Sequence, residues 1–484
     1  MVDATHLLRN FALSLRHGDA LENIRSGLIG EGMEIPGADG QVKLVYADYT
    51  ASGRAIMQVE DFVLRNVLPH YSNSHTEASF CGAYMNRLRG AARAEIARMC
   101  NASPEYAVIF TGSGATSGVN RLVHLLLSPS NAGAASAAQP LVLLGPYEHH
   151  SNILPWRESG AEVMEIPEAE PGGIDLAALE TALREQAATR RKIVGAFSAA
   201  SNVTGVIADV SATTALLKRY GALAIWDFAG GGPYLGIDAQ VGGGADAIVL
   251  SPHKFVGGPA ASGILIVRKD AVVATKPTFP GGGTVAFVSP WTHRYLGDVV
   301  AREEAGTPNV IGDIRAALAF LVKEAVGAEF ILERCAELRR RAVDMWRQED
   351  RIDLLGPRDA AALPILSFRV KDDAGGFVHH QLVTRLLSDH FGVQARGGCA
   401  CAGPYAHRLL GLSRERSDEL DQDLAGGAEF LKPGWTRLNL SYLMDDAKAD
   451  FVIAAVMQVA REAPKMARAY LADPATARFS RVKN

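Results

Sequence analysis

The fold of this chain is decided by Ser251-Pro252-His253-Lys254-Phe255-Val256-Gly257-Gly258-Pro259, which follows directly on the apolar run Ala247-Ile248-Val249-Leu250. The run is short, partly β-branched and bounded by glycines and a proline, which is typical of a buried strand. Lys254 therefore lies just beyond a strand end, where open α/β sheets form their sites. Burial disfavours an ammonium group, so this lysine could lose its proton and form a Schiff base with a carbonyl. The alternative is an ordinary exposed lysine in a Gly/Pro-rich turn.

Further short apolar runs alternate with helical patterns over residues 40–270. Continuously apolar strands that alternate with helices predict an α/β fold with a mostly parallel sheet covered on both faces. Beyond about residue 310 the pattern changes to a smaller α+β arrangement. The other predicted strands are 108–110, 141–144, 193–197, 223–226 and 264–267.

The overall composition argues against several classes of function. The 484 residues, 48% of them hydrophobic, suffice for a large core and more than one domain. The formal net charge is −4 without a basic stripe, so neither nucleic acid nor a membrane surface is an expected partner. No apolar run approaches the ~20 residues that span a bilayer, and we expect no secretory signal. Five cysteines do not make a disulfide framework, so we expect a cytoplasmic protein.

A stretch rich in glycine and hydroxyl groups follows the predicted strand 108–110 and reads Thr111-Gly112-Ser113-Gly114-Ala115-Thr116-Ser117-Gly118. Glycines let the backbone approach an anion, and the following helix presents free N–H groups and the positive end of its dipole. The stretch therefore predicts a phosphate site. It matches neither a P-loop nor the dinucleotide fingerprint, and Gly/Ser turns between a strand and a helix are common.

Three polar motifs follow other predicted strands. Asp227 ends the strand 223–226, where a buried carboxylate needs a partner such as a protonated pyridine nitrogen. His149, after 141–144, could stack on an aromatic ring and handle protons, and Asn202, after 193–197, offers an amide at the same edge. The alternative for Asp227 is a helix cap or a hydrogen-bonded core carboxylate. The alternative for His149 is a loop histidine of no special role, and that for Asn202 is a simple turn.

A second glycine-rich loop carries an arginine and two cysteines, in Arg396-Gly397-Gly398-Cys399-Ala400-Cys401-Ala402-Gly403-Pro404. The guanidinium fork suits a carboxylate, and either thiol becomes a nucleophile if nearby cations lower its pKa. Inert thiols are the alternative. A metal site is not expected, because no second Cys/His cluster completes a set of four ligands with Cys399, Cys401 and His407.

Taken in order, these motifs resemble the fold type I pyridoxal 5′-phosphate (PLP) enzymes. Within them the chain is similar to the class V aminotransferase-like group, in the branch of cysteine desulfurases and selenocysteine lyases, over about residues 40–465. The resemblance implies a homodimer whose subunit has a large PLP domain, with a seven-stranded type of sheet, and a small C-terminal domain. We expect an N-terminal helical segment (1–40) packing on the small domain, the large domain (41–310) and the small domain with the Arg/Cys loop (311–484).

The resemblance also implies a role for each matching residue. Lys254, Cys401 and His149 would be catalytic, with PLP bound covalently to Lys254, a persulfide formed on Cys401 and the His149 ring stacked on the cofactor. Arg396, Asn202 and His75 would bind the substrate, and Arg396 would take its α-carboxylate. Thr284, in Gly281-Gly282-Gly283-Thr284, would reach the cofactor phosphate of the neighbouring subunit. The other cofactor-binding residues would be Ala115, Thr116, Asn202, Asp227, Ser251 and His253.

The implied reaction converts L-cysteine to L-alanine, or acts on selenocysteine, and a sulfur-acceptor protein is an expected partner. Two positions depart from the family pattern. Gly230 stands where the family usually has glutamine, and Cys399 adds an accessory thiol. Two alternatives therefore stay open. One is another class V PLP reaction, carried out by an aminotransferase, C–S lyase, kynureninase-like enzyme or epimerase. The other is a non-enzymatic PLP-holding subunit that relays sulfur.

Overall fold

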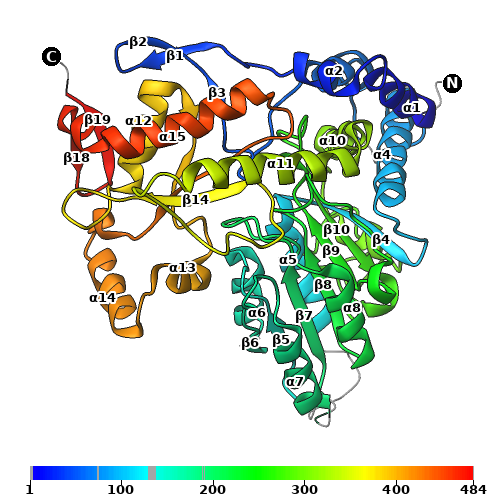
Figure 1. Cartoon of the computed structure of the whole chain (residues 1–484). Helices are drawn as coiled ribbons and strands as arrows, with labels where there is room; N and C mark the ends of the chain where they lie inside the picture. Colours follow the sequence, from blue (N-terminus) through cyan, green and yellow to red (C-terminus); the bar gives the residue numbers. More distant parts are fainter. Residues whose placement is uncertain (1–3, 74–75, 129–137, 188, 190, 483–484) are drawn as a thin grey trace. The chain divides into compact units, whose positions relative to one another are not determined.

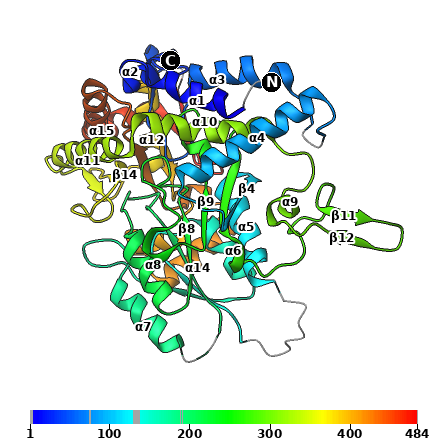
Figure 2. The same cartoon turned by 90° about the vertical axis from the view of Figure 1, so that its right-hand side faces the viewer.

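The computed structural model describes residues 4–73, 76–128, 138–187, 189 and 191–482 (Figures 1 and 2). The chain divides into two compact units. The first comprises Met1–Ile29, Ser52–Ala199 and Ala208–Ala328, and the second comprises Gly30–Ala51, Ala200–Ile207 and Glu329–Asn484.

These units differ from the expected division of the chain at three places. The N-terminal helix α1 (Ala4–Leu15) belongs to the first unit, where it packs on α4 (Phe80–Met99) and α10 (Val310–Val326), rather than on the small domain. Several of its apolar side chains, Leu8 and Leu15 among them, are buried in that unit. The boundary expected after residue 310 lies instead after Ala328, and the short segments 30–51 and 200–207 join the second unit.

The first unit is built on a seven-stranded sheet, which confirms the predicted α/β fold. Every predicted strand is present, and all strands are parallel except β10, which runs antiparallel to both of its neighbours. The missed edge strand β6 is only half-buried and carries charged residues at both ends. The order is β4 (Tyr106–Gly112), β10 (Gly263–Arg268), β9 (Ala247–Leu250), β8 (Leu223–Asp227), β7 (Ile193–Ser198), β5 (Leu141–Leu144) and β6 (Glu162–Glu165).

One face of this sheet is covered by α5 (Gly114–Leu127) and α6 (Leu154–Glu158), whose apolar side chains join those of the strands in a buried core. Gly118 lets α5 lie close to the sheet, because an added Cβ would be 3.0 Å from Val249 Cγ1 of β9. The other helices of the unit are α2 (Ala20–Ser26), α3 (Met57–Phe62), α7 (Leu176–Ala187), α8 (Val210–Arg219) and α9 (Val299–Glu303). A hairpin of β11 (Val285–Val288) and β12 (His293–Tyr295) projects from this unit (Figure 2).

The second unit carries the four-stranded sheet β13 (Ile352–Leu354), β14 (Ile365–Val370), β17 (Trp435–Asn439) and β16 (Arg396–Gly398). Its helices are α11 (Ala328–Trp346), α12 (His380–Phe391), α13 (Gly403–Leu410), α14 (Arg414–Ala425) and α15 (Asp446–Met466). Three further strand pairs complete the structure: β1 (Glu34–Gly37) with β2 (Gly40–Lys43), β3 (Val45–Tyr46) with β15 (Val393–Gln394), and β18 (Tyr470–Asp473) with β19 (Arg478–Arg481). Within the described residues, no helix has both the length and the apolar character needed to cross a membrane.

Candidate active site

The glycine-rich turn between β4 and α5 forms a cradle with the turn that follows β9. Gly112 and Gly114 have φ angles of 82° and 62°, which favour glycine. A Cβ at Gly114 would lie 2.8 Å from Cε1 of His253 and 3.0 Å from Oγ of Ser251. The amide of Ala115, in the first turn of α5, donates to Ser251 Oγ at 2.9 Å. Three predicted phosphate-binding residues thus meet at the N-terminus of a 14-residue helix, which is a general anion site.

Lys254 lies at the end of a short 3₁₀ turn, Pro252–Lys254, that leaves β9. Its backbone N–H donates to Ser251 O at 2.9 Å, and the next residue, Phe255, is buried and stacks on Phe320 of α10 with ring centroids 4.8 Å apart. The turn is therefore fixed on both sides of the lysine. Burial is the main cause that lowers the pKa of His253 to about 4, and the positive charge of Lys254 lowers it further. The same charge opposes the burial that raises the pKa of Asp227.

Asp227 ends β8 and is 4% exposed. Its Oδ1 accepts a hydrogen bond of 2.7 Å from the backbone N–H of Ala229. Burial raises the pKa of Asp227, while this hydrogen bond and the charge of Lys254 lower it. A buried carboxylate in this state gains from a second cation, so the position suits the protonated nitrogen of a heterocycle.

The ring of His149 is held by Ser151, a residue for which the sequence predicts no role. Its Nδ1 accepts from the backbone N–H of Ser151 at 3.1 Å, which assigns the proton of the neutral ring to Nε2. Ser151 Oγ lies 3.0 Å from the same Nδ1 and 2.7 Å from Oγ1 of Thr116. This chain of hydrogen bonds connects two predicted cofactor residues from different loops.

Glu148, which precedes His149 in the sequence, was also missed, because the segment was interpreted through its histidine alone. The side chain is buried, and Oε1 accepts from the backbone N–H of Ser198 at 2.8 Å. Oε2 accepts from Ser198 Oγ at 2.7 Å and from Asn152 Nδ2 at 2.6 Å. Burial is the main cause that raises the pKa of Glu148 to about 7, and the nearby charge of Asp227 adds to it. The carboxyl group ties the His149 loop to the end of β7, beside Asp227 on β8.

Arg396, in the second unit, is oriented by an acidic residue far away in the sequence. Its Nε donates to Oδ2 of Asp48 at 2.9 Å, and Oδ1 of the same carboxylate accepts from Arg437 Nη2 at 3.2 Å. Asp48 is therefore shared by two cations and does not neutralise either of them fully. Arg396 is more than half exposed, whereas Arg437 is buried, so Arg396 is the guanidinium that a substrate carboxylate can approach.

Asn202 lies in the second unit and contacts the cysteine loop. Its Nδ2 donates to Ala400 O at 2.7 Å, and its backbone oxygen accepts from Arg437 Nη1 at 3.0 Å. The side-chain oxygen Oδ1 is buried and accepts no hydrogen bond from any described residue. A buried polar atom of this kind fits a bound ligand that carries a donor. Cys399 is half-buried and Cys401 is exposed, and both are free thiols.

The structure gives less information about the roles of the other predicted residues. Thr284 is buried, and its hydroxyl donates to Gly281 O at 2.7 Å within the same turn. His75 lies outside the described residues. Gly230 lies in the turn after Asp227 and brings no side chain to it. Among the residues that the structure describes, no group of three or more His, Cys, Asp or Glu side chains could hold a metal ion.

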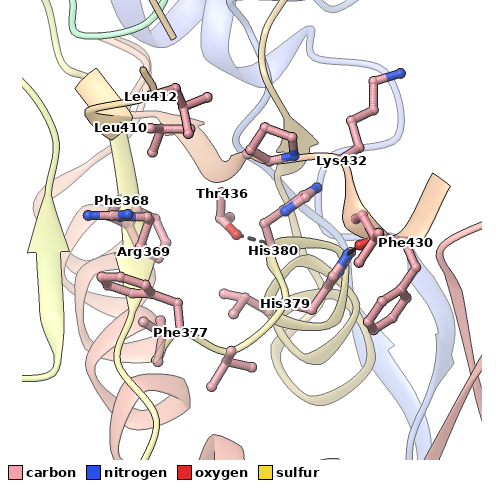
Figure 3. A pocket seen from close by; sticks show the side chains of 16 residues that line it. Phe368, Arg369, Phe377, His379, His380, Leu410, Leu412, Phe430, Lys432 and Thr436 are labelled. Atoms are coloured by element: carbon pink, nitrogen blue, oxygen red, sulfur yellow. Dashed lines mark hydrogen bonds between the residues drawn. The ribbon is translucent and has the colours of Figure 1, made fainter. Parts of the chain in front are cut away.

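A separate cavity of about 350 Å³ lies within the second unit (Figure 3). His379 stacks on Phe430 with ring centroids 4.5 Å apart, and the guanidinium of Arg369 lies 3.8 Å from the ring centroid of Phe377. None of the predicted site residues lines this cavity, and it contains no cysteine or acidic side chain. We therefore assign the chemistry to the strand-end residues and not to this cavity.

The strand-end residues of the first unit fit PLP, the cofactor expected from the sequence. Gly114 leaves space where a Cβ would meet Ser251 and His253, and the α5 amides supply donors for a phosphate. Asp227 supplies a buried carboxylate for a ring nitrogen, and Lys254 supplies an amine whose charge reaches that carboxylate. All of them lie at the carboxyl ends of parallel strands, the edge at which this class of sheet binds ligands.

The chain is similar to known proteins over most of its length. Residues 45–414 match the family Aminotransferase class-V. A probable cysteine desulfurase from Halalkalibacterium halodurans is 30% identical over 369 residues, which cover 75% of this chain and 84% of that protein. A probable cysteine desulfurase from Vibrio cholerae serotype O1 is 30% identical over 365 residues, which cover 75% and 85%.

Solved structures show the same fold. The apo structure of a cysteine desulfurase from Thermococcus onnurineus NA1 has a TM-score of 0.71 at 22% identity, covering 86% of this chain and 95% of that one. The cysteine desulfurase CsdA from Escherichia coli has a TM-score of 0.66 at 22% identity, covering 86% and 94%.

Proposed function

This chain belongs to the class V aminotransferase family, and from that premise we propose that it is a PLP-dependent cysteine desulfurase. It would take the sulfur of L-cysteine as a persulfide and leave L-alanine. The observation that carries the proposal is the exposed thiol of Cys401, which follows Arg396 by five residues on one loop of the second unit. The names of the relatives support the choice of substrate.

PLP would be held by residues of the first unit. The amine of Lys254 would bind it covalently, Asp227 would pair with its ring nitrogen, and the cradle of Ala115, Ser251 and His253 would take its phosphate. Bound PLP would supply an electron sink that makes the Cα proton of an amino acid acidic. The burial of Asp227 and the close approach of Gly114 to His253 support this assignment.

The residues of the chain would then divide the work. Arg396, oriented by Asp48, would bind the substrate carboxylate, and the amine of Lys254 would move the Cα proton. His149 would exchange a proton with the substrate sulfur through Nε2. The Cys401 thiolate would attack that sulfur, so that an S–S bond forms while the substrate Cβ–S bond breaks. The electron pair stays on the carbon skeleton, which takes up protons to become alanine. The proposal requires the Cys401 loop to reach substrate bound at the first unit.

Cys401→Ser is the test of this function. We expect the variant to keep the visible absorption of bound PLP but to produce alanine and sulfide from L-cysteine at least ~100-fold more slowly under a dithiol reductant, because a serine hydroxyl is a far weaker nucleophile than a thiolate. Both products are quantified by mass spectrometry and sulfide assay. Cys81→Ser, which removes another half-buried free thiol, is the matched control and should keep full activity. Undiminished activity in Cys401→Ser would contradict the proposal, and a keto acid product would indicate transamination.

We further propose that the active form is a homodimer in which Thr284 contacts the neighbouring cofactor phosphate. The β11–β12 hairpin supports this, because its apolar side chains are poorly covered within the chain: Phe287 is 51% exposed, Val288 61% and Trp291 90%. Exposed apolar groups gathered on a projecting hairpin mark an interaction surface.

Trp291→Asp should therefore weaken self-association at least tenfold, since large aromatic side chains dominate most interfaces. Sedimentation velocity over a concentration series measures the effect. Leu471→Asp, at a similarly exposed apolar position in the second unit, is the control and should leave association unchanged. If Trp291→Asp associates like the parent protein, the hairpin is not the interface.

A further inference from the structure

The two cysteines of the arginine loop lie in one tight turn. The backbone N–H of Ala402 donates to Cys399 O at 3.3 Å, and the two central residues, Ala400 and Cys401, both have φ of 54°. Positive φ at both central positions is the signature of a type I′ turn, which usually needs glycine or asparagine. Asn202 holds the turn through its hydrogen bond to Ala400 O. The loop thus maintains a conformation that alanine and cysteine adopt only at a cost.

This turn holds the Cα atoms of the two cysteines at a separation that a disulfide can span. A residue with a Cβ and a φ near 54° has only the left-handed helical region open to it, and helical dihedrals of either hand place the flanking Cα atoms roughly 5.4 Å apart. Disulfides form when the Cα atoms are about 4.4–6.8 Å apart. Cys399 and Cys401 flank Ala400, so the separation of their Cα atoms falls within this range.

The two thiols differ in exposure. The remaining cysteines are poorly placed or too inert to react with a group carried by Cys401. Cys401 is exposed, whereas Cys399 is half-buried in the same turn. Cys100 and Cys335 are buried, and burial raises the pKa of each thiol to about 12, which keeps them protonated and inert. Cys81 belongs to α4 of the first unit. Cys399 is therefore the thiol placed to react with whatever Cys401 carries.

We propose that Cys399 is a resolving thiol, which turns the Cys401 persulfide into free sulfide and an internal disulfide. This inference rests on the proposed desulfurase function. The Cys399 thiolate attacks Sγ of Cys401, forming a bond between the two cysteine sulfurs while the bond from Cys401 Sγ to the outer sulfur breaks. The outer sulfur leaves with the electron pair and a proton as hydrosulfide. The outer sulfur is reduced to sulfide and the Cys399 thiol is oxidised, while Cys401 Sγ keeps its oxidation state, so this step needs no external oxidant.

A dithiol reductant of the thioredoxin class would then restore both thiols. The complete cycle converts one cysteine and one dithiol into alanine, hydrogen sulfide and one disulfide, which balances atoms and electrons. The enzyme would in this way release sulfide itself, instead of holding a long-lived persulfide for an acceptor protein.

The test is a single turnover of the PLP-loaded protein after its thiols have been reduced and the reductant removed. One equivalent of L-cysteine is added per site, and the reaction is quenched in acid and alkylated. Trypsin cleavage after Arg396 and Arg408 releases both loop cysteines in one peptide, which is analysed by mass spectrometry. Alanine and sulfide are measured in the same sample.

We expect the parent protein to yield about one sulfide per alanine and a loop peptide about 2 Da lighter than the reduced, unalkylated form, as an internal disulfide requires. Cys399→Ser should still yield one alanine per site, but at least tenfold less sulfide, and its peptide should be about 32 Da heavier from a stable persulfide. Cys399→Ala should behave in the same way, and both variants should keep the visible PLP band, which excludes misfolding.

A parent protein that keeps a persulfide on Cys401, with Cys399 alkylated and sulfide as low as in Cys399→Ser, would overturn the resolving role and favour transfer to an acceptor protein. If no sample produces alanine from L-cysteine, the desulfurase function itself is wrong. The failure of the inference and the failure of the proposed function are therefore distinguishable.

Discussion

Lys254→Ala is expected to lose the visible absorption of bound PLP and at least ~10⁴-fold of the activity with L-cysteine, because we propose that this one amine both holds the cofactor and moves the Cα proton. The local structure should survive the change. The turn is fixed by the backbone bond from residue 254 to Ser251 O and by the stacking of Phe255 on Phe320, and neither contact involves the lysine side chain. Absorption spectra of the reconstituted protein and single-turnover formation of alanine measure both effects.

Lys254→Arg separates covalent attachment from charge. The guanidinium keeps a positive charge near Asp227 and His253 but is a poor nucleophile toward a carbonyl, so this variant should lack the visible band as completely as Lys254→Ala. Lys269→Ala, which removes an exposed lysine of the same unit, should behave like the parent protein. A normal spectrum in Lys254→Arg would show that this position does not bind the cofactor covalently, and the assignment of the whole site would fail with it.

The strand-end residues of the first unit could be predicted because two local signals combine. Short apolar runs identify the strands, and parallel strands bring their carboxyl ends to one edge, so Ser251, His149 and Asp227 had to lie along the same edge. The structure confirms the strands and places the Ser251 hydroxyl against the Ala115 amide. These two residues belong to the turns after β9 and β4, which are separated in the sheet by β10 alone. The pattern of the chain was enough for the strands and their shared edge, whereas the roles of Ala115, Ser251 and His253 are implied by the resemblance to the PLP enzymes.

The site residues that the sequence did not predict are those that orient other site residues through hydrogen bonds between distant segments. Asp48 lies 348 positions from Arg396, and a short segment with half-exposed strands offers no local pattern that predicts this ion pair. Glu148 and Ser151 lie beside His149 in the sequence, but their roles depend on Thr116 of α5 and Ser198 of β7. A hydrogen bond between distant segments leaves no periodicity in either of them, so it could not be found from the sequence.

The division of the chain into units was mispredicted for a related reason. Residues 312–347 show one continuous helical pattern, but the structure breaks it at Gly327, whose φ of 92° ends α10 before α11 begins. A single glycine in a helical pattern is often tolerated, so the break was not evident. The end of the sequence favours frayed residues over 478–484, but Arg478–Arg481 form β19 because they pair with β18. Residues 483 and 484 lie outside the described residues. The Tyr470 hydroxyl of β18 donates to Asp389 at 2.9 Å and anchors that hairpin.

Asp227→Asn is expected to lower kcat with L-cysteine by roughly 10- to 1000-fold. An opposite charge within a few ångströms shifts a pKa by roughly 1–3 units, and each unit changes the protonated fraction of a ring nitrogen about tenfold. Asparagine keeps the shape and can still accept from the Ala229 amide, so the change removes the charge and little else. KM should change less than kcat, since the proposed partner of Asp227 is the cofactor and not the substrate.

The same substitution should raise the free energy of unfolding of the protein when PLP is absent. Burial raises the folded-state pKa of Asp227 above its unfolded value, so the ionised carboxylate costs stability, and this cost appears as the pH rises through the ordinary aspartate range and beyond. At neutral pH the apoprotein of Asp227→Asn should therefore melt at a higher temperature than the parent apoprotein, while the loaded variant works poorly. Differential scanning calorimetry with and without PLP measures this.

Asp246→Asn gives the matched control for Asp227→Asn. Asp246 is also buried in the first unit, but it precedes β9 at the opposite edge and is paired with Lys218 at 2.8 Å. Removal of that charge should lower the melting temperature and leave the activity per folded molecule unchanged, because a paired buried carboxylate stabilises and an unpaired one does not. If both variants lost stability alike and neither lost kcat, Asp227 would be an ordinary core carboxylate, and the ring nitrogen would need a different partner.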